Sequence, residues 1–275
     1  MFFAVPPKPL SWCLPSVSHL SIFWRLVAVS LFSTLTACAG TGFDGSHSGK
    51  SSALGTDDGA HDGETPAPSS PPEAPSPWSH KTFPGKKWTQ YAAVRIDRRD
   101  AIRSDSVSSA SMLRQKVRVE PADIGKVAFS WKVNELIKDA DVTQRDTDDS
   151  PVRVVLVFDG DRTTFSAKNA MLSELAYTLT GEPLPYATLM YVWDNQAAKE
   201  SIVVNTRTDR IRKIVMESGP LQLGRWLDYE RDIRADYEKV FGEAPGALVG
   251  IGVMTDSDNT RQSAQAWYGP VTLRK

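Results

Sequence analysis

The chain has 275 residues, with 32 basic and 33 acidic side chains, so its formal net charge is −1 at pH 7. Residues 80–275 are close to neutral, with 29 basic and 27 acidic residues, and such a balance gives no reason to expect nucleic acid as a partner. Both cysteines and all four histidines lie at or before residue 80, so residues 81–275 exclude Ser-His-Asp and Cys-His catalysis, most zinc sites and disulfides.

A hydrophobic run from Leu26 to Ala37 follows Arg25 and ends in Leu35-Thr36-Ala37-Cys38. It is shorter than the roughly 20 apolar residues that span a membrane, and it fits the apolar region of a signal peptide. The small residues before the cysteine resemble a bacterial lipobox. The resemblance implies that residues 1–37 are removed as a lipoprotein signal peptide and that Cys38 is lipidated, although an ordinary signal-peptidase site also fits. By the same resemblance to lipoproteins, Ala39 in place of aspartate implies an outer-membrane lipoprotein of the cell envelope that faces the periplasm.

Residues 38–79 form the next segment, which is dominated by Gly, Ser, Pro and Asp. Such a composition buries too little apolar surface to offset its conformational entropy, so we expect the lipidated cysteine to be followed by a disordered tether. The folded part is then a single domain over residues 80–275, which is long enough for one full core.

Apolar alternation and short apolar runs predict about nine strands in this domain. The predicted strands are Tyr91–Ile96, Met112–Val119, Val127–Val133, Val152–Phe158, Tyr186–Trp193, Ser201–Val204, Ile211–Glu217, Ala247–Met254 and Ala266–Leu273.

Two helices are predicted between the strands. Met171, Leu172, Leu175 and Leu179 share one face of a helix that Gly181 ends, and an aromatic stripe predicts a second helix over Arg225–Phe241. We therefore expect a mainly β fold: an antiparallel β-sandwich, of jelly-roll or galactose-binding-like type, with two inserted α-helices.

Acidic residues gather at the predicted strand ends. Asp146, Asp148 and Asp149 precede one strand, and Asp256, Asp258 and Asn259 follow another. Oxygen-only clusters suit Ca²⁺, and a carboxylate pair would also suit a glycosidase. The same residues are common turn formers that need no ligand. Trp193, at the end of a strand beside a turn, is a candidate platform for a sugar ring, although a core tryptophan is the simpler interpretation.

Several motifs in order resemble the bacterial family named domain of unknown function 3047, over most of residues 85–273. The motifs are Phe129–Val133, Asp148–Arg153, Pro185–Trp193, Glu217–Gly219, Tyr229–Ile233 and Met254–Thr260. The resemblance implies a single β-rich domain in an extracytoplasmic setting, and it carries over no catalytic residue. It directs attention to polar or aromatic residues at the element ends, which form either a ligand pocket or a structural ion network: Asp149, Arg153, Trp193, Arg231, Asp236, Asp256, Asp258 and Asn259.

The sequence thus leaves three hypotheses open. The first is a lipid-anchored, non-catalytic module that binds a ligand, possibly a glycan of the envelope, and an exposed Trp193 beside a groove would favour it. The second is a carboxylate-dependent glycan hydrolase, which an open cleft with two carboxylates about 5–9 Å apart would favour. The third is a structural or assembly lipoprotein that binds another protein, which a buried Arg–Asp network would favour.

Overall fold

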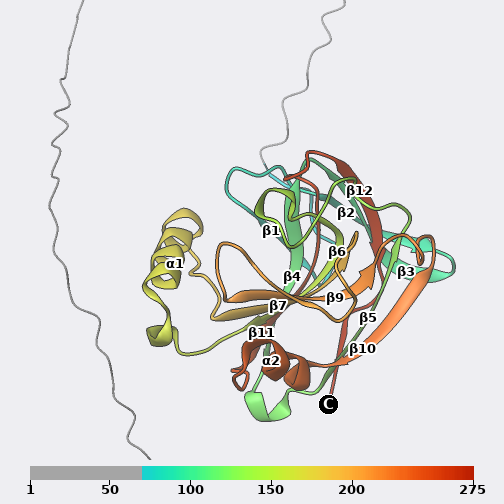
Figure 1. Ribbon diagram of the computed structural model, residues 1–275. Helices are drawn as coiled ribbons and strands as arrows, with labels where there is room; N and C mark the ends of the chain where they lie inside the picture. The colour runs from blue at the N-terminus through green and yellow to red at the C-terminus, as the bar shows by residue number, and fades with distance from the viewer. Residues whose placement is uncertain (1–69) are drawn as a thin grey trace, which may run out of the picture. The chain divides into compact units, whose positions relative to one another are not determined.

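The computed structural model describes residues 70–275, which form a two-sheet β-sandwich with two α-helices (Figure 1). The strands are β1 (Ser79–Thr82), β2 (Gln90–Ile96), β3 (Arg99–Val107), β4 (Ala110–Val119), β5 (Lys126–Val133), β6 (Ser150–Phe158), β7 (Ala187–Asp194), β8 (Ile202–Val204), β9 (Ile211–Ser218), β10 (Trp226–Asp232), β11 (Leu248–Asp256), β12 (Ser263–Tyr268) and β13 (Thr272–Arg274). The helices are α1 (Ala167–Thr180) and α2 (Ile233–Phe241).

The larger sheet has seven strands in the order β1-β4-β11-β6-β7-β9-β8. The smaller sheet has the order β10-β5-β12-β3-β2, and β13 pairs with β5. One core lies between the sheets, because alternate residues of each strand point inward. Val154, Leu156 and Phe158 of β6 face Phe129 and Trp131 of β5 across this core, which confirms the predicted fold class.

One strand pair departs from the antiparallel pattern. β7 and β9 are parallel, because the chain leaves β7, forms the edge strand β8 and returns between them as β9. All other strand pairs among residues 70–275 are antiparallel.

The prediction of a single helix over Arg225–Phe241 is wrong for its first half. Trp226–Asp232 is strand β10, which pairs along its whole length with β5, and α2 begins only at Ile233. The Asp232 carboxylate accepts a hydrogen bond from the Ala235 N–H and caps the helix there. Alternate burial along β10 shows that this segment has the period of a strand, which the aromatic stripe concealed.

Strand β3 was not predicted, because its sequence alternates weakly and is mostly polar. It pairs with β2 through a two-residue turn in which Asp97 (φ 51°) and Arg98 (φ 62°) both adopt the left-handed conformation. This is the geometry that fits the twist of a tight hairpin. The predicted strand Ala266–Leu273 is divided into β12 and β13 around Gly269-Pro270.

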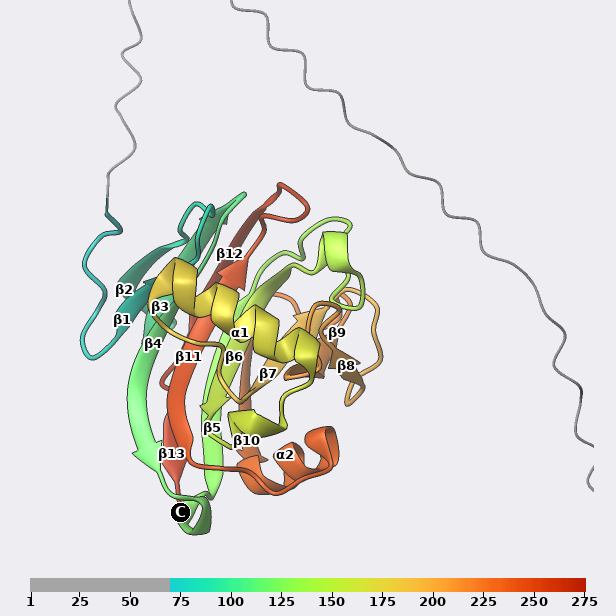
Figure 2. The ribbon, with the colours of Figure 1, turned by 90° about the vertical axis from the view of Figure 1, so that its left-hand side faces the viewer.

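Helix α1 lies across the outer face of the larger sheet (Figure 2). Ser166 caps its first turn, and Gly181 ends it in the left-handed conformation, as predicted. Its apolar side chains are not packed as expected, however. Met171, Leu175 and Leu179 are 65%, 53% and 59% exposed, and only Asn169 and Ser173 of the helix are buried.

The packed part of the chain begins before residue 80. Ala74 and Trp78 pack against the main core, and β1 begins at Ser79. The predicted signal peptide, Cys38 and most of the predicted tether lie outside the described residues. Among residues 70–275, no helix is both long and apolar enough to cross a membrane.

Candidate functional site

A pocket of about 330 Å³ lies on the outer face of the larger sheet, and we call it the polar pocket. Its polar lining comprises Lys86, Arg145, Asp148, Arg153, Asn205, Thr206, Arg207, Lys213, Asp256, Asp258 and Asn259, and Phe83, Pro84, Met190 and Met254 are among its apolar lining residues. Strand register explains this gathering, because Arg153 pairs with Met254 and Met190 pairs with Lys213. Alternation on four neighbouring strands thus places these side chains on one face.

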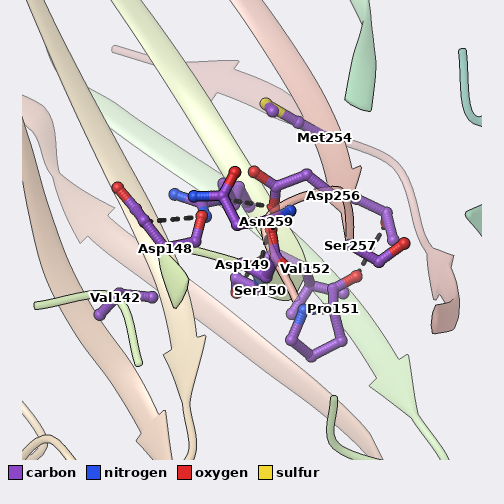
Figure 3. Close-up of polar contacts among 12 residues, drawn as sticks. Val142, Asp148, Asp149, Ser150, Pro151, Val152, Met254, Asp256, Ser257 and Asn259 are labelled. Carbon is purple, nitrogen blue, oxygen red and sulfur yellow. Dashed lines mark hydrogen bonds and ion pairs between the residues drawn. The ribbon is translucent and has the colours of Figure 1, made fainter. Parts of the chain in front are cut away.

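Arg153 is the centre of the pocket's floor. It is 3% exposed, and its Nε donates to Asp256 Oδ1 at 2.9 Å. Its Nη2 donates to the carbonyl oxygen of Asp148 at 2.9 Å and to Asp148 Oδ1 at 3.1 Å. Figure 3 shows Asp148 and Asp256 in this network together with the neighbouring Asp149 and Asn259. A buried guanidinium is thus neutralised by two carboxylates from different segments.

Lys213 extends the floor to strand β9. Its ammonium, 1% exposed, donates to the Val142 carbonyl at 2.9 Å and forms an ion pair with Asp148. Asn205 Nδ2 donates to the other oxygen of Asp148 at 3.4 Å. The network therefore joins β6, β9, β11 and the loop before β6, and it holds the polar groups at a rigid sheet surface.

Burial and charge set the protonation of these groups. Burial, together with the nearby carboxylates of Asp149 and Asp148, raises the pKa of Asp256 to about 7 in spite of Arg153. Burial and the charge of Arg153 lower the pKa of Lys213 to about 8, although Asp148 opposes this. Burial would raise the pKa of Asp148, but Arg153 and Lys213 outweigh it and lower this pKa. Burial thus opposes the charged forms of both Asp256 and Lys213 in this floor.

Asp149 holds the loop after β11 in place through hydrogen bonds. Its carboxylate, 1% exposed, accepts hydrogen bonds from the Asn259 N–H at 3.2 Å, the Thr260 N–H at 2.7 Å and the Thr260 hydroxyl at 2.6 Å. Asn259 Nδ2 donates to the Arg145 carbonyl. These contacts fix the loop that carries Asp258, so Asp149 is a structural residue of the site.

The three acids Asp149, Asp256 and Asp258 place carboxylate oxygens within 4.8 Å of one another. Each already has protein donors: the loop amides for Asp149, Ser150 N–H and Arg153 for Asp256, and Lys86 for Asp258. A calcium ion would have to compete with two cations and several N–H groups, so the donor set fits a salt-bridged network better than a metal site.

The sequence-predicted residues fall into separate places. Asp149, Arg153, Asp256, Asp258 and Asn259 come together as described above. Arg231 and Asp236 instead form a bidentate ion pair at 2.8 and 2.7 Å, and Asp236 also accepts from the Tyr191 hydroxyl. This pair ties α2 and β10 to β7, and neither residue lines the polar pocket.

Trp193 is not a platform. Its side chain is 0% exposed in the core, and its Nε1 donates to the Gly219 carbonyl at 3.1 Å. Of the two interpretations of Trp193, the core tryptophan is the one observed, because the inward phase of β7 places Leu189, Tyr191 and Trp193 on the core face.

Sequence reasoning missed Lys213, Asn205 and Lys86. The position of Lys213 could have predicted its role, since a lysine in the middle of an apolar strand either pairs with a buried acceptor or points to solvent. Lys86 and Asn205 lie in loops, and nothing in their local sequence placed them beside β11.

Comparisons with known proteins give distant similarities of architecture. A family 11 carbohydrate-binding module of a cellulosomal cellulase from Clostridium thermocellum is 10% identical, with a TM-score of 0.34, and the match covers 71% of this chain and 86% of that one. The xyloglucanase domain of NopAA, a type three effector from Sinorhizobium fredii, is 9% identical, with a TM-score of 0.38 and coverage of 72% and 93%. A cellulase derived from Cel12A of Rhodothermus marinus is 9% identical, with a TM-score of 0.34 and coverage of 72% and 95%.

None of the curated proteins matches the chain. The family model described as a protein of unknown function, DUF3047, matches residues 76–272, which are most of the chain and almost all of its described part. The chain belongs to the DUF3047 family.

Proposed function

We propose that this protein is a non-catalytic binding module of the cell envelope, and that its polar pocket holds an acidic glycan. The observation that carries the proposal is the polar pocket itself, where fixed donors and acceptors of both charge signs surround a volume of about 330 Å³. Pockets of this size with a few convergent polar groups are typical of small-ligand sites.

The charge of the lining favours an anionic ligand. Five cationic side chains line the pocket against three acidic ones. The buried cations Arg153 and Lys213 are matched by Asp256 and Asp148, and Lys86 pairs with Asp258. Arg145 and Arg207 are exposed at the rim, and they are the groups available to a carboxylate or phosphate on the ligand. The acids and asparagines of the pocket suit sugar hydroxyls.

The proposed location of the domain is the membrane surface, where a lipid anchor would hold it. Cys38 would be acylated after removal of residues 1–37 and would hold the domain at the outer membrane, facing the periplasm. The support is the lipobox-like segment Leu35-Thr36-Ala37-Cys38. A glycan of the envelope would then lie within reach of the domain.

A hydrolase is the rival candidate, because a carboxyl whose pKa is about 7 is suited to general acid catalysis. The geometry supports it less well. Asp256 is 6% exposed, and both Asp256 and Asp258 are occupied by cationic partners. Hydrolysis would require one of them to be released to the substrate.

The test is calorimetric binding of the purified protein to acidic and neutral envelope polysaccharides. We expect the acidic polymers to bind, and Arg207→Glu to weaken that binding by about tenfold or more through charge reversal at the rim. Arg95→Glu is the matched control, because Arg95 is exposed on the other sheet, and it should bind like the wild type. Absence of binding to every polymer, or equal loss in both variants, would contradict the proposal. New reducing ends in the bound polymer would favour the hydrolase.

A further inference from the structure

Helix α1 crosses the outer face of the larger sheet (Figure 2), and its apolar side chains Met171, Leu175 and Leu179 are more than half exposed. Its ends are held by polar contacts: Asn169 Nδ2 donates to Asp209 at 2.6 Å, and Glu182, just after the helix, forms a bidentate pair with Arg114 at 2.7 Å. Leu175 and Leu179 remain more than half exposed between these attachments. The helix therefore forms one wall of an open space.

The floor of this space is lowered by glycine. Gly250 and Gly252 lie on the outer face of β11, where a side chain would normally stand. A Cβ on Gly252 would lie 3.0 Å from Met112 Sδ and 3.1 Å from the Leu113 carbonyl oxygen, so a larger residue would crowd its neighbours. Glycine in a central strand costs stability, and here it keeps the floor open.

The resulting apolar groove has a volume of about 720 Å³. Its walls and floor include Met112, Val157, Leu172, Leu175, Leu179 and Leu184. The volume falls within the range of about 300–1,000 Å³ for small-molecule sites. Filling an apolar space of this size with an apolar ligand lowers the free energy, because apolar surface is removed from water.

The rim of the groove carries a net positive charge. Lys81, Arg114, Lys116 and Arg162 line it against a single acid, Glu182. Glu182 is already paired with Lys81 and Arg114, whereas Lys116 is exposed. The combination of an apolar interior and a cationic rim is complementary to a molecule with an apolar chain and an anionic end.

We infer that the apolar groove binds the acyl chain of an anionic lipid, with the anionic headgroup at Lys116 and the neighbouring basic side chains. An extended peptide fits less well, because β11 in the floor is a central strand whose backbone groups are already paired with β4 on one side and β6 on the other. A peptide in the groove would bury N–H and C=O groups without partners. An acyl chain has no such groups.

This inference goes beyond the proposed glycan site, since Leu175 lines the groove and not the polar pocket. The two spaces are neighbours, however, because Phe83 and Pro84 line both of them. A ligand that carries both a glycan and an acyl chain would fill the two together.

The probe is hexadecanoate, kept below its aggregation concentration and titrated into the purified protein by calorimetry. We expect binding of one molecule per protein, and binding at least tenfold weaker for octanoate, which buries fewer methylene groups. Hexadecanol tests the headgroup, and it should bind more weakly than hexadecanoate. Lys116→Glu should weaken hexadecanoate binding, whereas Arg95→Glu should not.

Two variants of α1 separate the groove from the rest of the helix. Leu175→Asp places a charge in the groove and should abolish hexadecanoate binding. Met171→Asp is the matched control, because Met171 is 65% exposed and does not line the groove, and it should bind normally. Both positions are exposed, so both variants should fold, which melting curves verify. Hexadecanoate that does not bind, or that binds Leu175→Asp as tightly as wild type, would overturn the inference. A dimer that Leu175→Asp dissociates, without fatty-acid binding, would assign the groove to a second copy instead.

Discussion

At the scale of single residues, the buried carboxyl of Asp256 makes the stability of the folded protein depend on pH. Burial raises its pKa in the folded protein to about 7, against 3.8 as its ordinary value. The folded state thus binds a proton more tightly than the unfolded state, and the contribution of Asp256 to stability is fully present below about pH 4. It is lost as the pH rises towards 7, by roughly 4 kcal/mol at 1.36 kcal/mol per unit.

We therefore predict that the stability of wild type relative to Asp256→Asn falls between pH 4.5 and 7.5. Urea unfolding of both proteins across this range measures the difference. A difference that grows with pH would mean that Arg153 dominates over burial and that Asp256 is held as a carboxylate.

The cluster of Asp149, Asp256 and Asp258 leads us to predict how calcium affects stability. Its oxygens are occupied by N–H donors and by Arg153 and Lys86, so we expect neither calcium nor a chelator to change the melting temperature. An increase in melting temperature that scales with calcium concentration would indicate binding to the folded state, and the acids would then be metal ligands.

At the scale of elements, burial separates two tryptophans on paired strands. Trp131 of β5 is 0% exposed, whereas Trp226 of the edge strand β10 is only partly buried and donates to Asp97. Trp131→Ala should cost about 3–5 kcal/mol, and Trp226→Ala should cost clearly less because it opens no core cavity. Denaturant midpoints of the two variants provide the comparison. Equal losses would show that β10 is as central to the core as β5.

The elements that could be predicted from the sequence are those that bury an apolar side. The strand over Val127–Val133 was found from its alternation, and the strands over Val152–Phe158 and Ala247–Met254 were found as apolar runs of strand length. β3 was missed because it is mostly polar and is stabilised by pairing with β2 in a hairpin. β10 was mistaken for a helix because its aromatic residues are spaced three or four apart, as on one face of a helix, although the segment pairs with β5 as an edge strand. In the site, Asp256 and Arg153 were identifiable as polar residues at strand ends. Lys86 and Asn205 were not, since only the folded chain brings these loops together.

At the scale of the whole molecule, the proposed function requires a domain that is anchored to the membrane. We predict that Cys38→Ser leaves the protein either as unprocessed precursor or free of the membrane. The substitution removes the thiol that would be acylated, and stable anchoring requires more than one acyl chain. Fractionation and labelling with a radioactive fatty acid measure this, and Cys13→Ser is the matched control. A mature wild-type protein that carries no label would contradict the proposed lipid anchor.

Amide hydrogen exchange tests most directly whether the polar pocket binds the ligand. The purified protein is measured with and without an acidic polysaccharide that binds in the calorimetric screen. We predict new protection in the loops around the pocket, at residues 83–87, 205–208 and 256–260, with little change in the β2–β3 hairpin of the other sheet. Protection that is confined to the smaller sheet, or absent from all three loops while the ligand is bound, would contradict the claim.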